Sequence, residues 1–187
     1  MLKSGMTKSE IEQELKGKGD FVQIDHLGRF LKEQMALDTK KFVFLKLASL
    51  YEKASMLHDS AKMYDNAAEI SIPFVEKIKH YTKEAELYVK AGSFDRVELA
   101  MRKALAQGNF KEKEDIYTSI KMLYKEQANV CEKELRRNQA LKFYEKILEM
   151  RISEQERREV KEKILELYKK LGKLHESLAL EKSLQKP

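Results

Sequence analysis

The sequence predicts an all-α protein, a helical solenoid of about four helix pairs preceded by two short helices. Apolar residues recur at spacings of three and four along most of the 187 residues, which is the periodicity of one helical face. Seven Gly and two Pro are too few for the many turns of a β-protein. A short pattern of small and aromatic residues also returns four times, as it does in arrays of stacked helix pairs.

Charge is abundant and nearly balanced along the chain. There are 37 Lys and Arg against 31 Asp and Glu, giving a formal net charge of +6, and the excess leans toward the C-terminal half. Long solvated helices have this composition, and so do ion-pair-rich proteins of thermophiles. The positive excess is open to two interpretations, a solvated surface or a surface for an acidic or nucleic-acid partner.

Cysteine usage and hydropathy limit the classes of protein further. The single cysteine, Cys131, excludes an internal disulfide and a cysteine-based zinc site. No apolar run of a signal peptide follows the first residues, and the most apolar stretch, 42–51, is interrupted by Lys46 and is too short to span a bilayer. We therefore expect a cytoplasmic protein with no membrane insertion.

Residues 1–39 are predicted to cap the array with two short helices. Thr7 and Glu10 form a capping box, a hydroxyl cap with a glutamate three residues later, and predict a helix over 8–16. A second helix is expected over 26–37. Between them, an apolar loop is expected to enter the core, formed by Phe21, Val22 and Ile24.

The repeats are predicted to occupy residues 40–187 without a linker, so that the whole chain forms a single domain. Asp38 or Thr39 is expected to cap the first long helix, over 40–56, and Asp59 its return helix. The boundaries of the second pair are Ser71 as a cap with Pro73 in the first turn, Gly92 and Ser93 at the turn, and Gly108 at the end.

The third pair begins with the longest predicted helix, over 110–135. Asn109 with Glu112 starts it, and it breaks near 136–138. The signals of the fourth pair are a capping box, Ser153 with Glu156, and a break at Gly172.

Four helix-ending positions define the repeat: Tyr51, Tyr88, Cys131 and Tyr168. Three residues before them stand Ala48, Ala85, Ala128 and Leu165, and nine residues after them stand Ser60, Val97, Ala140 and Ser177. A small residue lets two helices approach, and a large residue fills the space opposite. Because neither helix can bury its apolar face alone, each pair must stack on the next.

This arrangement resembles the tetratricopeptide repeat over residues 41–185. The family's pattern of small and aromatic positions matches Ala48, Tyr51, Ser60, Tyr64 and Ala67, and in the second copy Ala85, Tyr88, Val97, Met101 and Ala104. The copies are longer than the usual unit of about 34 residues, and the fourth has Lys161 and Glu181 where aromatics are expected. The longer units, with the segment 61–70, are similar to the extended arrays of the soluble NSF attachment proteins. The resemblance implies a right-handed solenoid.

In this family the first helices of the pairs line a groove that takes a peptide or a partner helix. The resemblance places the groove at Phe42, Leu45, Lys79, Glu86, Met122, Lys125 and Asn129, and in the fourth copy at Glu159, Glu162, Glu166 and Lys170. One subfamily clamps a C-terminal carboxylate with a lysine and an asparagine four apart. Lys125 and Asn129 match that pair, but the next copy has Lys163 where an asparagine is needed.

No pattern in the chain indicates catalysis. The four histidines, His26, His58, His80 and His175, include no two at the spacing of a metal pair on one helix, and no glycine-rich phosphate loop or nucleophile elbow is present. We therefore expect no enzyme activity, no cofactor and no small-molecule substrate.

Two surface features suggest partners. One is a basic patch in the C-terminal half, formed by Lys133, Arg136, Arg137, Arg151, Arg157, Arg158, Lys161, Lys169 and Lys170. The other is the last helix, which is apolar on two sides and carries Leu174, Leu178, Leu180 and Leu184. Either the N-terminal helices cover its exposed side or a second copy does, which would make a homodimer.

The leading hypothesis is a protein–protein adaptor without catalytic activity. The alternative is a factor that docks on RNA or the ribosome through the basic patch, as a homodimer that bridges or blocks ribosomal subunits.

Overall fold

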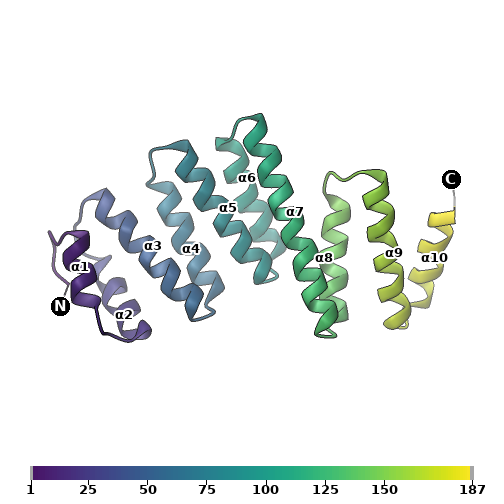
Figure 1. Cartoon of the computed structure of the whole chain (residues 1–187), viewed down its shortest axis with the longest axis horizontal. Coiled ribbons are helices and arrows are strands. Elements are labelled where there is room, and N and C mark those ends of the chain that lie inside the picture. Colours follow the sequence, from purple (N-terminus) through teal and green to yellow (C-terminus); the bar gives the residue numbers. More distant parts are fainter. Residues whose placement is uncertain (1, 186–187) are drawn as a thin grey trace. The chain divides into compact units, whose positions relative to one another are not determined.

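The structure is a computed structural model that describes residues 2–185, and these form helices and turns without any strand (Figure 1). Two compact units divide the chain, one up to Ile116 and one from Tyr117. The all-α prediction is confirmed, and the single continuous domain stays a prediction. The helices are α1 Lys8–Leu15, α2 Asp20–Phe30, α3 Leu37–Lys53, α4 Leu57–Glu69, α5 Phe74–Lys90, α6 Phe94–Gln107, α7 Phe110–Lys133, α8 Arg137–Glu149, α9 Glu154–Lys170 and α10 Leu174–Gln185.

The second N-terminal helix differs from the prediction at both ends, because it stops at Phe30, seven residues before the predicted end, and Leu37 begins α3. The capping box of Thr7 and Glu10 starts α1 as expected, but α2 begins at Asp20, six residues before the predicted start. Phe21 and Val22 therefore do not form a core loop but lie on the first turn of α2, 72% and 48% exposed. An acidic residue in the first turn complements the helix dipole, which favours this earlier start.

A hydrophobic core joins α1, α2 and α3 in the first unit. Its buried residues are Ile11, Leu15, Leu27, Phe30, Val43, Leu47 and Leu50. The pairs from α1 and α2 are spaced by four and three, so each short helix turns one apolar stripe onto α3. Neither Asp38 nor Thr39 caps α3. Ala36 holds the N-cap position, and Asp38 instead forms an ion pair with Lys8 at 2.5 Å.

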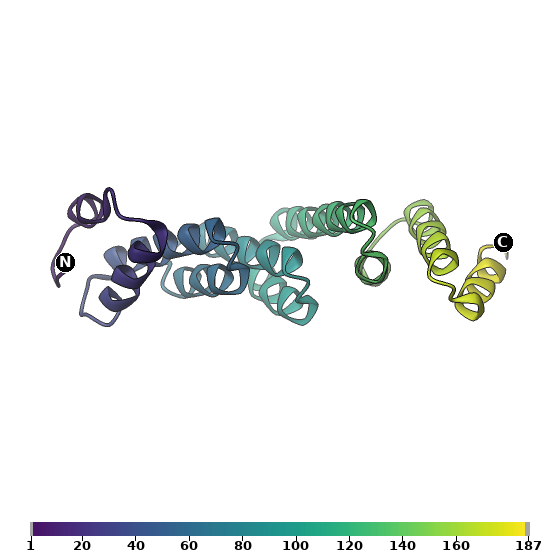
Figure 2. The same ribbon diagram turned by 90° about the horizontal axis from the view of Figure 1, so that it is seen from below.

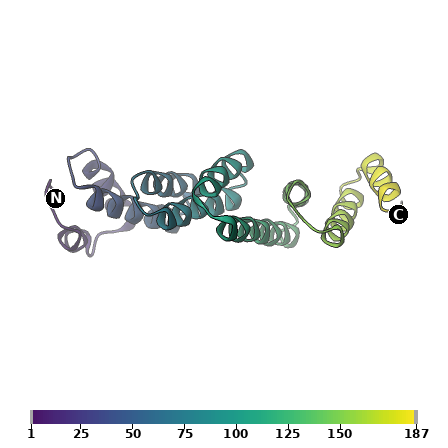
Figure 3. The same ribbon diagram turned by 90° about the horizontal axis from the view of Figure 1, so that it is seen from above.

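Helices α3 to α6 pack in chain order, each against the next (Figures 1 and 3). The small residues of the repeat lie at these contacts, and Ala48 and Ala85 are completely buried. The hydroxyl of Ser60 on α4 donates a hydrogen bond to the carbonyl of Ala48 on α3 at 2.8 Å. The close approach that the small residues predict is therefore present.

The same turn ends the first helix of all four pairs. The residue four positions after each helix-ending position has a positive φ: Ser55 (59°), Gly92 (69°), Leu135 (58°) and Gly172 (70°). The next N–H donates back to the carbonyl of the helix-ending residue at 2.8, 2.9, 2.8 and 2.9 Å. This is the Schellman motif. The repeat that side chains define in the sequence therefore returns in the backbone.

A longer period relates the two units. Helices α8 and α9 begin and end 80 positions after α4 and α5. The part of α7 that lies in the second unit likewise ends 80 positions after α3. The second unit therefore repeats the helix pattern of α3 to α6.

Some predicted helix caps are confirmed and others are wrong. Asn109 and Glu112 exchange hydrogen bonds of 2.8 and 3.0 Å at the start of α7, and Gly108 ends α6. Asp59, however, lies in the first turn of α4 and does not cap it. The Ser71 hydroxyl donates to the carbonyl of Ala67 instead of capping α5, whose N-cap position is Pro73.

The last two helices of the second unit, α9 and α10, pack against each other (Figure 2). Among residues 2–185, no helix has the length and apolar character that crossing a membrane would need.

Candidate binding groove

A groove of about 510 Å³ lies in the second unit, and α7, α8 and α9 supply its walls. Its lining residues are Lys125, Asn129, Tyr144, Glu159, Val160, Glu162, Lys163 and Glu166. Five of them are groove positions that the repeat resemblance implied, two on α7 and three on α9. The groove is therefore built mainly from the first helices of the third and fourth pairs.

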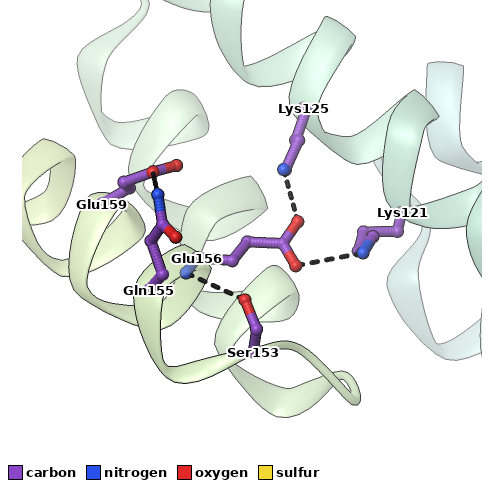
Figure 4. Close-up of polar contacts among 6 residues, drawn as sticks. All are labelled: Lys121, Lys125, Ser153, Gln155, Glu156 and Glu159. Carbon is purple, nitrogen blue, oxygen red and sulfur yellow. Dashed lines mark hydrogen bonds and ion pairs between the residues drawn. The ribbon is translucent and has the colours of Figure 1, made fainter.

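Glu156 fixes the position of α9 against α7 (Figure 4). Its backbone N–H donates to the hydroxyl of Ser153, the cap of α9, at 3.2 Å. Its carboxylate accepts hydrogen bonds from Lys121 at 3.0 Å and Lys125 at 2.5 Å, and its side chain is only 17% exposed. The predicted capping box is thus half formed, because the carboxylate faces α7 and not the start of its own helix.

The two lysines also set the ionisation of this carboxylate. The hydrogen bond from Lys125, with that from Lys121, holds the pKa of Glu156 below its usual value although partial burial opposes the charge. Lys125 is consequently committed to an internal partner. A carboxylate clamp would need this ammonium free, and Lys163 stands at the position of the clamp's next asparagine.

Tyr144 forms the floor of the groove and is almost completely buried. Its hydroxyl donates to Glu132 at 2.6 Å and contacts Asn129 Oδ1 at 3.3 Å. Burial, with the neighbouring Glu132 carboxylate, raises the pKa of Tyr144, so the phenol remains a neutral donor. Beside it, the buried Val160 completes an apolar base for the groove.

The charged residues of the wall differ in how they are paired. Glu166 pairs with Lys170 at 2.6 Å and Glu162 with Arg158 at 3.4 Å. Glu159 accepts a hydrogen bond from the amide of Gln155 at 3.3 Å (Figure 4). Within residues 2–185, Lys163 has neither a hydrogen bond nor an ion pair. The groove thus presents one uncommitted ammonium beside carboxylates that are mostly bound.

The predicted groove positions of the first unit have a different setting. Phe42 packs against the core below α1 and α2, Leu45 and Glu86 are half-buried, and Lys79 is exposed. Lys83 binds Glu52 at 3.2 Å and Glu86 at 3.6 Å, so an ion pair connects α3 and α5 there. In the second unit, Met122 is exposed on α7 and is not part of the groove lining.

Tyr144, Val160 and Lys163 line the groove, but the sequence interpretation did not assign them to it. The sequence interpretation considered Lys163 only as a departure from the clamp pattern. The 80-residue period aligns Tyr144 and Lys163 with Tyr64 and Lys83 of the first unit.

The predicted basic patch is largely occupied by internal acidic partners. Arg136 binds Glu134, Arg158 binds Glu162, and Lys169 binds Glu181 at 3.2 Å. Lys170 binds Glu166 in the groove wall. Lys133 and Arg151 are exposed, whereas Arg137, Arg157 and Lys161 are half-buried. Internal pairing lowers the positive potential available for phosphate groups.

The last helix exposes one side. Leu174 and Leu178 are 70% and 56% exposed, whereas Leu180 and Leu184 are half-buried. This agrees with the predicted two-sided distribution. Self-association through α10 stays a prediction.

Cys131 and Glu84 are buried ionisable groups outside the groove. Burial raises the pKa of the Cys131 thiol, as expected for a core cysteine. Glu84 on α5 is 4% exposed, and its Oε2 has no hydrogen-bond partner. Burial, together with the nearby Asp65, raises the pKa of Glu84 to about 8. Among residues 2–185, no three His, Cys, Asp or Glu side chains gather as a metal ion would need.

No family model and no curated protein sequence matches the chain. Among solved structures it is similar to the crystal structure of BtubC (BKLC) from P. vanneervenii, with 15% sequence identity and a TM-score of 0.38. That similarity covers 94% of this chain and 75% of the other. A similarity this low supports no inference about the function of this protein.

Proposed function

We propose that the chain is a non-catalytic helical-repeat protein of the tetratricopeptide type, an adaptor that holds a segment of a protein partner in the groove of its second unit. In this proposal the four helix pairs stack as a right-handed solenoid. The observation that carries the proposal is the groove itself, an open space with an apolar base and mixed charges on its walls.

Support for the repeat type comes from features that all four copies share. Each first helix ends in the same Schellman turn. The position nine residues after the helix end is buried in every copy, at Ser60, Val97, Ala140 and Ser177. A helix pair built with one turn and one set of small contacts is the unit of a stacked array.

Support for a protein partner comes from the chemistry of the lining. Val160 and Tyr144 offer apolar surface, the Asn129 amide offers hydrogen bonds, and Lys163 offers a positive charge. Three carboxylates on α9 line the same wall and would repel a phosphate backbone. A polypeptide segment matches such a surface because it carries apolar, polar and charged groups together.

Charge reversal at the groove wall tests the proposal. Whole-chain wild type, Glu159→Lys and Glu126→Lys are used to capture partners from native lysate, and the captured protein is then titrated against each purified variant. Glu126 is exposed on α7 and does not line the groove, so its reversal is a matched control. We expect Glu159→Lys to abolish binding and Glu126→Lys to retain it. Equal binding by both variants would overturn the groove as the binding site.

The RNA alternative is tested in the same experiment. Phosphate contacts release counterions, so RNA-mediated capture should weaken steeply between about 50 and 200 mM salt. Capture through the groove is expected to persist over this range. Neutralising Arg157, Arg158 and Lys161 together should leave groove binding unchanged, whereas loss of an RNA–protein particle from that variant would favour the alternative.

A further inference from the structure

One set of five side chains occurs in both units, at positions 80 apart. In the first unit the latch residues, as we call them, are Glu52, Tyr64, Lys83, Glu86 and Lys90, and in the second they are Glu132, Tyr144, Lys163, Glu166 and Lys170. All five residue types are identical between the two sets.

The helices that carry the latch residues have the same register in both units. Lys41 on α3 binds Glu76 on α5 at 2.7 Å, and Lys121 on α7 binds Glu156 on α9 at 3.0 Å. These two ion pairs are also 80 positions apart. Since the neighbouring contact is reproduced, the spacing that lets Lys83 reach Glu52 is available to Lys163 and Glu132.

In the first unit the latch residues have what we call the closed arrangement. Lys83 crosses from α5 to Glu52 on α3 at 3.2 Å and also binds Glu86 at 3.6 Å. Tyr64 and Lys90 make no hydrogen bond or ion pair within the described part of the chain. The lysine therefore joins the two first helices.

In the second unit the same residues have what we call the open arrangement. The Tyr144 hydroxyl holds Glu132 at 2.6 Å, and Lys170 holds Glu166 at 2.6 Å. Glu132 and Glu166, which correspond to the two carboxylates that bind Lys83 in the first unit, are thus both engaged by other residues. Among the described residues, Lys163 in the groove wall makes no hydrogen bond or ion pair, although its charge lies close enough to lower the pKa of Glu166.

We propose that the groove of the second unit also has the closed arrangement, in which Lys163 crosses to Glu132 and Glu166, and that Tyr144 and Lys170 hold it open. The inference rests on the proposed function, because it describes the regulation of that groove. The exchange replaces one set of charge-assisted hydrogen bonds with another, so neither arrangement is strongly favoured. A partner that binds only the open groove shifts the population toward it.

Lysine reactivity in the free, whole chain reports the two arrangements. Partial burial opposes the charge on Lys83, but the hydrogen bond to Glu52 and the negative charges of Glu52 and Glu86 together outweigh it and raise the pKa of the ammonium. An ammonium held by a carboxylate gives up its proton less readily and reacts more slowly with an acetylating reagent. Site-resolved acetylation rates from mass spectrometry should therefore be several-fold higher for Lys163 than for Lys83.

Two variants should close the groove. Tyr144→Phe frees Glu132, and Lys170→Gln frees Glu166, so each should slow the acetylation of Lys163 toward the rate of Lys83. Adding Glu132→Gln to Tyr144→Phe should restore the fast rate. Tyr64→Phe is the matched control and should leave Lys83 unchanged, because the Tyr64 hydroxyl holds no carboxylate.

Lys170→Gln keeps the test valid if Tyr144→Phe unfolds, since Lys170 is exposed. An unchanged Lys163 rate in the folded variants would overturn the latch. This measurement needs no partner. If Glu159→Lys loses partner capture while the acetylation rate of Lys163 stays the same in the latch variants, only the proposal of two arrangements is therefore overturned. If the acetylation rate of Lys163 changes in the latch variants while Glu159→Lys captures its partner normally, only the proposed binding function of the groove is overturned.

Discussion

The two units place identical latch residues on matching helices, and yet the residues choose different partners. The neighbours of the tyrosine explain the difference. In the second unit Asn129 Oδ1 contacts the Tyr144 hydroxyl at 3.3 Å, at a position where the first unit has the shorter Ser49. In the first unit the ring of His80 lies 6.1 Å from that of Tyr64, at a position where the second unit has Val160. The same residue types therefore bind different partners where the surrounding side chains differ.

The units also differ in their cores. Glu84 of the first unit corresponds to Ile164 of the second, and both side chains are buried. Met63, only partly buried against the first core, corresponds to the fully buried Phe143. The second unit thus has the more apolar interior at these positions, and the first contains a buried carboxyl.

The largest expected effect is the loss of unfolding free energy when a core residue of each unit is replaced by alanine. Phe143→Ala should lower the free energy of unfolding by about 3–5 kcal/mol, because it removes a buried ring and leaves a cavity. Met63→Ala should cost less, since that side chain is partly solvated already. Denaturant unfolding with hydrogen exchange should locate the loss of protection in α8 to α10 for Phe143→Ala. Similar losses for both variants would contradict the difference between the cores.

Exchanging the buried carboxyl for an apolar side chain should give the next largest effect. The folded-state pKa of Glu84 is about 8 against a usual 4.5, so the folded protein holds a proton that the unfolded chain releases. Its contribution to stability is therefore lost as pH rises from 4.5 to 8. Glu84→Leu should stabilise the first unit by about 3 kcal/mol at pH 9 and by much less at pH 5.

Thermal unfolding of Glu84→Leu across this pH range checks the sign. Ile164→Glu is the reciprocal variant and should destabilise the second unit, most strongly at high pH. A gain from Glu84→Leu that does not change with pH would show that Glu84 is not the titrating group.

The shared turn allows a comparison across all four copies. All four residues have a positive φ. This conformation strains Ser55 and Leu135, which have a Cβ, but not Gly92 and Gly172. Ser55→Gly and Leu135→Gly should each be stabilising or neutral, within about 1 kcal/mol, while Gly92→Ala and Gly172→Ala should each cost about 1 kcal/mol. Chemical denaturation of the four variants measures this. Stabilisation by both alanine variants would contradict the Schellman assignment.

The smallest effect concerns the ion pairs that set the helix register. Glu156 binds two lysines and is mostly shielded from water, whereas Glu76 binds one lysine, Lys41, and is more exposed. A double-mutant cycle for Glu156 and Lys125 should give a coupling of about 1 kcal/mol at low salt. The cycle for Glu76 and Lys41 should give less. The pKa of Glu156 is lowered, so its contribution is present above the unfolded pKa and disappears as pH falls.

The sequence predicted helix boundaries best where a residue caps or ends the helical turn to which it belongs. The capping boxes at Thr7 and Asn109, and the breaks at Gly92 and Gly172, are all confirmed. Prediction failed at α2, where the two glycines before Asp20 and the apolar residues after it suggested a loop. At the groove, the repeat pattern indicated which positions of α9 face it, but it did not identify the floor or the paired and unpaired lysines.

Periodicity and caps act within one or two turns of a helix, so most helices and the four-fold repeat can be predicted from the sequence. Which carboxylate each lysine binds, and where a groove remains open, depends on the packing of the helices and does not follow from the sequence. Those choices depend on side chains that three helices bring together. Lys83 and Lys163 occupy the same place in the repeat, but among the described residues Lys83 bridges two helices whereas Lys163 makes no hydrogen bond or ion pair.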